Sequence, residues 1–199
     1  MGYKLTWAYI WQNGTEQQIR PKNTQTFDFQ NDWALGWTAY STGYWTPTIK
    51  SGEWWYIWTS NNQAYQGYVI APSSIFGGTL KKIKIWAYRP STSPSNAIWI
   101  YTADSGNNRF EYGRDNNCIY VNWTKMTATP RYWEITIELT FWNSLGIEVS
   151  DGTNTDNYDW WDVVAGFQTQ WENQNLWLML GRWAAYVCYI RKLEITTES

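Results

Sequence analysis

Two glutamates share one side of a strongly alternating stretch, "WEITIEL" (133–139), where Glu134 and Glu138 flank Thr136. In a strand, residues two and four positions apart point to the same face, so both carboxyl groups would lie together. Retaining cleavage of a glycosidic bond needs two such groups about 5–5.5 Å apart with separated pKa values. A solvated strand face of alternating Glu and Thr is the simpler interpretation, and it is preferred. We therefore expect no enzymatic activity, with hydrolysis by this pair as the alternative.

The same seven residues resemble the glutamate-x-aspartate-x-glutamate strand of the laminarinase-like glycoside hydrolases. The resemblance implies that one of Glu134 and Glu138 is a nucleophile and the other a general acid. In that family the central aspartate interacts with the nucleophile and helps to set its protonation. Thr136 stands at that position here, so both implied roles lack this support.

Oxygen donors are concentrated in "DGTNTDNYDWWD" (151–162). Calcium binds about six to eight oxygens from loops of this composition. The EF-hand spacing is absent, and Asp, Asn and Gly also form turns for backbone reasons alone. A turn is therefore favoured and no cofactor is expected. The alternative is a calcium site, whose candidate ligands are Asp151, Asn154, Asp156 and Asp159.

Aromatic residues make up 20% of the chain, which has 18 Trp and 15 Tyr. In several alternating segments one face is aliphatic and the other aromatic. In 82–88, Lys82 and Lys84 share a face with Trp86, and lysine is rarely buried, so this aromatic face is predicted to lie outside. Covering loops are the alternative. The outward candidates for binding a glycan or a protein partner are Trp7, Trp11, Trp54, Tyr56, Trp58, Trp86, Tyr88, Trp99 and Tyr101.

Charge and residue content narrow the possible functions. Only 16% of residues are charged and the net charge is -2, so no nucleic-acid partner is expected. No stretch approaches the roughly 20 apolar residues of a membrane span. Histidine, the commonest general base and transition-metal ligand, is absent. Cys118 and Cys188 either form a disulfide or are small buried residues, and their spacing does not decide between the two.

Short alternating segments separated by turn residues predict an all-β fold, a jelly-roll-like antiparallel two-sheet β-sandwich formed by one domain over 1–199. The N-terminal segment 4–11 is expected to be the first strand of that sandwich or to pair with a neighbouring subunit. Segment 158–168 is expected to be a strand or a short helix. The other predicted strands are 26–29, 33–40, 53–59, 64–71, 79–89, 97–103, 117–123, 131–142, 145–149, 175–180 and 184–196.

The strand rhythm, the aromatic content and the closing "YVCYIRKLEI" (186–195) resemble the jelly-roll carbohydrate-binding modules and the concanavalin-like sandwiches. The resemblance implies a fold in which exposed Trp and Tyr rings stack on sugars. It assigns no role to a particular residue.

Two functions compete on these observations. The low charge, the many outward aromatics and a start without a secretory signal favour a non-enzymatic structural protein, a virion or extracellular assembly subunit. Its partners would be copies of itself or other assembly proteins, at the virion surface or outside the cell. The alternative is a non-catalytic carbohydrate-binding module that stacks glycans on exposed Trp and Tyr.

Overall fold

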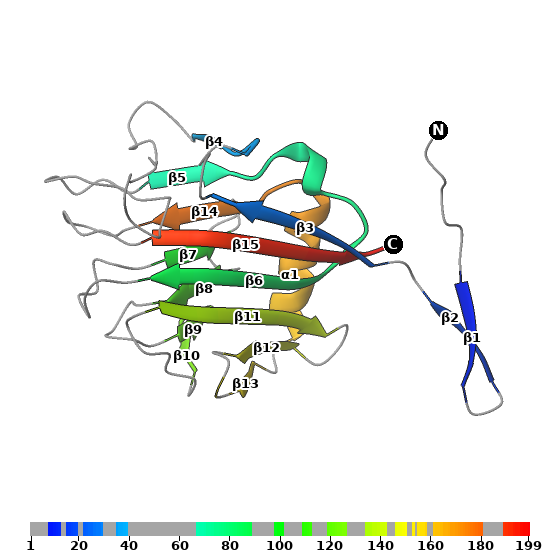
Figure 1. Cartoon of the computed structure of the whole chain (residues 1–199). Helices are drawn as coiled ribbons and strands as arrows, with labels where there is room; N and C mark the ends of the chain where they lie inside the picture. The colour runs from blue at the N-terminus through cyan, green and yellow to red at the C-terminus, as the bar shows by residue number, and fades with distance from the viewer. Residues whose placement is uncertain are drawn as a thin grey trace, which may run out of the picture.

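The protein is a sandwich of two antiparallel β-sheets with one α-helix (Figure 1). This confirms the fold predicted from the sequence. The structure, a computed structural model, describes residues 8–12, 15–19, 22–29, 35–39, 67–88, 98–101, 109–112, 119–126, 134–142, 146–150, 153, 155–158, 161–180 and 189–199. The segment predicted as a strand over 53–59, Cys118 and Cys188 lie outside these residues.

The first sheet has six strands in the order β13-β12-β11-β6-β15-β3. Its central strand β6 alternates as predicted, because Ile83 and Ile85 are fully buried whereas Lys84 and Trp86 are partly exposed. The edge strand β3 pairs with β15 so that the first residue of β3 lies opposite Glu198. The bounds are β3 (Lys22–Asp28), β6 (Thr79–Tyr88), β11 (Glu134–Trp142), β12 (Gly146–Ser150), β13 (Thr155–Tyr158) and β15 (Tyr189–Glu198).

The second sheet has seven strands in the order β10-β9-β8-β7-β14-β5-β4. Its strands are short, and β8 lies in a stretch for which the sequence predicted no strand. The bounds are β4 (Thr38–Ala39), β5 (Gly67–Ile70), β7 (Ile98–Tyr101), β8 (Arg109–Tyr112), β9 (Ile119–Val121), β10 (Thr124–Lys125) and β14 (Trp177–Leu180).

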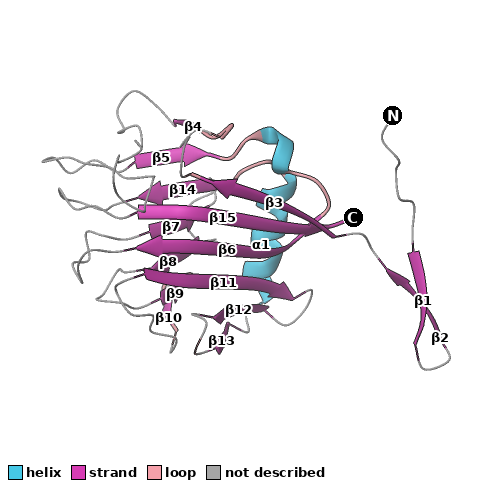
Figure 2. Ribbon diagram, viewed as in Figure 1, coloured by secondary structure: helices cyan, strands magenta, loops and turns pink. Residues whose placement is uncertain are grey.

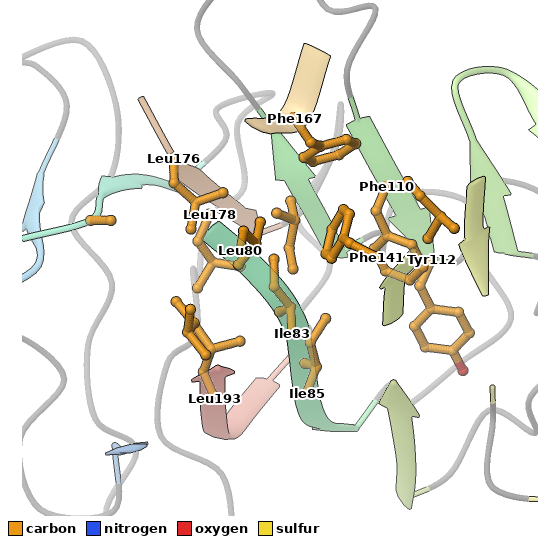
Figure 3. Close-up of a cluster of buried hydrophobic side chains, with 14 of the residues drawn as sticks. Leu80, Ile83, Ile85, Phe110, Tyr112, Phe141, Phe167, Leu176, Leu178 and Leu193 are labelled. Atoms are coloured by element: carbon orange, nitrogen blue, oxygen red, sulfur yellow. The ribbon is translucent and has the colours of Figure 1, made fainter. Parts of the chain in front are cut away.

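The hydrophobic core fills the space between the two sheets (Figure 3). Ile83 and Ile85 of β6 meet Phe110 and Tyr112 of β8 in one buried cluster. Burying each aliphatic side chain contributes about 1.5–3 kcal/mol, so this alternation holds the sheets together.

One helix, α1 (Trp161–Glu172), packs beside the core and contacts β6 and β12 (Figure 2). Phe167 and Trp171 are one helical turn apart and both are buried. The side chain of Gln168 makes two hydrogen bonds to the backbone of Leu80. Its Oε1 accepts from the Leu80 N–H at 3.0 Å, and its Nε2 donates to the Leu80 carbonyl oxygen. The stretch predicted as a strand or a short helix is thus mostly helix. Among the described residues, no helix has both the length and the apolar character needed to cross a membrane.

The N-terminal residues described form a hairpin of their own, β1 (Ala8–Gln12) with β2 (Thr15–Ile19). Figure 1 shows this hairpin to one side of the sandwich. Within the described residues, the predicted first strand therefore pairs with the next segment of its own chain and not with a strand of the sandwich.

Replacing Gly78 by alanine is expected to lower the free energy of unfolding by more than about 1 kcal/mol. Gly78 has a φ of +67°, and an added Cβ would lie 2.6 Å from the backbone oxygen of Glu198. The neighbouring Gly77 is the matched control, because a Cβ there meets nothing within 4 Å. Urea unfolding of both variants checks the prediction, and equal losses would contradict it.

Candidate functional site

The predicted outward aromatics are divided among separate surfaces. Trp86 and Tyr88 belong to β6 in the six-stranded sheet, whereas Trp99 and Tyr101 belong to β7 in the seven-stranded sheet. Trp11 lies on the β1–β2 hairpin. These residues therefore do not form one patch. The remaining candidates, Trp7, Trp54, Tyr56 and Trp58, lie outside the described residues.

On the six-stranded sheet, Trp86 lies among charged side chains. The Nζ atoms of Lys84 and Lys192 are 4.9 and 4.6 Å from its ring centroid. Lys192 also pairs with Glu194 at 2.6 Å. Each cation–π contact at a partly exposed site contributes about 0.5–1 kcal/mol. The two lysines around Trp86 thus interact with groups on the same side of this sheet.

The register of β11 with β6 pairs Glu134 with Tyr88 and Glu138 with Lys84. In the register, Glu138 lies opposite Lys84, which in turn lies opposite Glu194. Acidic and basic positions therefore alternate across three neighbouring strands. The Cα atoms of the two glutamates are separated by four strand steps, about 13 Å. Retaining cleavage needs the two carboxyl groups about 5–5.5 Å apart, which is less than half of this Cα separation.

The oxygen-rich stretch is described only in part. Asp156 lies on β13, where its Oδ1 accepts the N–H of Asn157 at 2.9 Å, a local turn-type hydrogen bond. Asp151, Asn154 and Asp159 lie outside the described residues. Within the part of the chain that the structure describes, no three Asp, Glu or Cys side chains gather as a metal site would require.

The outer face of the seven-stranded sheet is rich in aromatics. Ile100, Phe110 and Leu178 point into the core, so their strand neighbours occupy the opposite side. The register places Trp99 opposite Glu111, and Glu111 opposite Tyr120. We call this side of the sheet the Trp99 face. Its positions are Thr38, Tyr68, Ile70, Trp99, Tyr101, Arg109, Glu111, Tyr120, Lys125, Trp177 and Met179.

Glu111 is the unusual member of the Trp99 face, because its side chain is fully buried. Tyr120 beside it is only 8% exposed. Withdrawing a carboxylate from water is costly unless it is well bonded. One oxygen, Oε2, accepts no hydrogen bond, although the residue takes part in other interactions. Sequence reasoning missed Glu111, yet the alternation in "RFEY" (109–112) was the available signal.

Other parts of the Trp99 face reach solvent. Trp177 in the middle of the sheet is partly exposed, and Thr38 and Lys125 toward its two edges are exposed. On the Trp99 face, Glu111 of β8 and Tyr120 of β9 are therefore buried, whereas positions on the strands to either side are accessible to solvent. Flat aromatic residues around a few polar groups are typical of sites that bind small polar ligands.

No protein-family model matches the sequence, and no curated protein matches it either. Solved structures do match. "Apo Crh5 transglycosylase" is 18% identical with a TM-score of 0.55, covering 87% of this chain and 84% of that one. "Crh5 transglycosylase in complex with NAG" is 16% identical with a TM-score of 0.55, covering 87% and 83%. A protein of unknown function from Shewanella oneidensis MR-1 is 12% identical with a TM-score of 0.50, covering 90% and 88%.

At these identities the likeness is one of fold, and it confirms the sequence's fold-level resemblance to concanavalin-like sandwiches. The prediction of a virion or assembly subunit is wrong. Two of the three structures named above are transglycosylases, one of them in complex with NAG, and none of the three is described as an assembly protein. Outward aromatics misled the prediction, because the same residues suit either a protein interface or a sugar.

Proposed function

We propose that this protein is a non-catalytic carbohydrate-binding protein and that the Trp99 face contacts the sugar. The observation that carries the proposal is the register of β7 and β14, which sets Trp99, Tyr101 and the partly exposed Trp177 on one side of the seven-stranded sheet. Aromatic rings offer a flat apolar surface to the C–H face of a pyranose. The polar residues on this face offer hydrogen-bonding groups for its hydroxyls. An extracellular location belongs to the same proposal.

Binding is favoured over cleavage by the charges on this face. Retaining and inverting cleavage both use a pair of carboxyl groups. Among the described positions of the Trp99 face, Glu111 is the only acidic residue. One carboxylate within an aromatic surface suits recognition better than two-carboxylate chemistry.

The test is to titrate soluble polysaccharides into the protein and to measure binding by isothermal titration calorimetry. The variants Trp99→Ala and Trp86→Ala form a matched pair. Trp99→Ala is expected to weaken binding at least about tenfold. Covering about 60 Å² of ring area contributes roughly 1.5 kcal/mol, which corresponds to that factor. Trp86→Ala removes the same ring from the opposite sheet and is expected to leave binding unchanged. Equal effects of the two variants would contradict the assignment of the face.

Glycoside cleavage or transfer is a second candidate, favoured by the register that keeps Glu134 and Glu138 on one face. Two of the structures that resemble this fold are transglycosylases by name. Its test is product formation from polysaccharide by the wild-type chain and by Glu134→Gln. Activity lost in that variant would support cleavage, and no product from any glycan would reject it.

A further inference from the structure

The hairpin that joins β9 to β10 has an unusual turn. Val121 pairs with Thr124, which leaves Asn122 and Trp123 as a two-residue loop. Both have positive φ, 46° and 74°. Positive φ at both central positions defines a type I′ turn, whose twist matches that of the flanking strands.

Tryptophan is a poor residue for this position. Type I′ turns favour Asn-Gly, because glycine adopts positive φ without a steric penalty. A bulky residue with positive φ is a genuine outlier, and such outliers tend to occur where function requires them. Asn122 fits the turn, so the unfavourable choice is confined to Trp123.

Burial within the chain does not explain the choice. Trp123 is 51% exposed, and it is the only exposed large hydrophobic residue among those whose side-chain burial the structure describes. By contrast, Val121 and Met126 on either side of the turn are buried in the core. The turn therefore keeps about half of the indole surface exposed at a conformational cost, while Trp123 also interacts with other parts of the chain.

We propose that Trp123 is a further carbohydrate-contacting residue, which extends the site from the Trp99 face to the end of the β9–β10 hairpin. This inference rests on the proposed function. Trp99, Glu111 and Tyr120 lie opposite one another on β7, β8 and β9, so Trp99 is two strand spacings, about 10 Å, from β9. Trp123 lies beyond Tyr120 at the end of the β9–β10 hairpin. A ligand that reaches from Trp99 to Trp123 must therefore be longer than a single sugar ring. The ligand class is therefore an extended polysaccharide chain.

The surroundings of the turn favour a sugar as the occupant. Asn122, Thr124 and Lys125 are the neighbours of Trp123 in the sequence, and all three are at least partly exposed. Amide, hydroxyl and ammonium groups donate hydrogen bonds to sugar hydroxyls, whereas the core of a protein interface is usually depleted of charge. Lys125 lies opposite Tyr120 in the register, so the turn is continuous with the Trp99 face.

The experiment compares long and short oligosaccharides on the wild-type chain and on Trp123→Gly. The variant creates the favoured Asn-Gly turn, so its Tm is expected to be at least that of the wild type. Affinity for a hexasaccharide is expected to fall about tenfold, while affinity for a disaccharide bound at the Trp99 face stays unchanged. Trp123→Asn, which also tolerates positive φ, serves as a second variant without the ring.

The outcomes separate the two proposals. If the wild type binds no oligosaccharide, the proposed function fails and this inference fails with it. If the wild type binds and Trp123→Gly binds the hexasaccharide equally well, only this inference is overturned. A wild-type dimer in light scattering that Trp123→Gly converts to a monomer would also overturn it, because the ring would then serve contact between copies.

Discussion

Replacing Trp171 by alanine is expected to lower the free energy of unfolding by about 3–5 kcal/mol. The side chain is 2% exposed, and its ring centroid lies 4.7 Å from that of Phe76. Its Nε1–H donates to the Gly78 carbonyl at 3.1 Å, a bond that ties α1 to the start of β6. Alanine would leave both a cavity and an acceptor without its donor. Because domains are stable by only about 5–15 kcal/mol, this is a large share of the total.

Urea unfolding followed by far-ultraviolet circular dichroism measures this loss without depending on tryptophan fluorescence. Trp171→Phe is the control, because it keeps a six-membered aromatic ring and removes the N–H together with the rest of the indole. Its expected cost is about 1–2 kcal/mol. A loss below about 1 kcal/mol in the alanine variant would show that α1 is not tied to the sandwich through this residue.

Replacing Glu111 by glutamine is expected to weaken polysaccharide binding about tenfold or more without lowering Tm. Glutamine has nearly the same shape, so the packing on β8 is kept. The variant replaces the carboxyl group by a neutral amide, which changes how this position interacts with its cross-strand neighbours on β7 and β9. The fold gains little from the charge of the carboxylate, because keeping a carboxylate out of water opposes folding. We infer that Glu111 positions its neighbours Trp99 and Tyr120 for ligand binding.

Calorimetry and thermal unfolding of the same samples separate the two effects of Glu111→Gln. A fall in Tm with unchanged affinity would show that the carboxylate serves the fold alone. Glu148→Gln, at a partly exposed position on the opposite sheet, is the control and should change neither quantity.

Local alternation predicted the strands that form the centre of the six-stranded sheet. In β6 the lysines mark the outer face, so the buried positions of Ile83 and Ile85 could be assigned from seven residues. The helix was harder to predict, because the buried pair Phe167 and Trp171 follows a helical period that extends past the segment considered. Strand β8 was missed because it is four residues long and is flanked by turn-forming residues.

The candidate site could be predicted only in part. Trp99 and Tyr101 were predicted to face outward from their alternation with aliphatic residues, and the register places both on the Trp99 face. The sequence did not reveal that Trp86 and Trp99 belong to opposite sheets, because sheet membership depends on pairing between distant segments. It also did not reveal Glu111, since a charged residue is expected at the surface unless the tertiary structure encloses it.

The pairing of β3 with β15 has a consequence for the order of the chain. Lys22 and Glu198 lie opposite each other, so the sandwich begins and ends at the same corner of one sheet. The start of β3 and the end of β15 are therefore neighbours in space. A short linker that joins these two ends, with new termini in a loop elsewhere, would give a circular permutant that keeps every strand pair of both sheets. The architecture therefore resides in the pairing of the strands and not in which strand comes first.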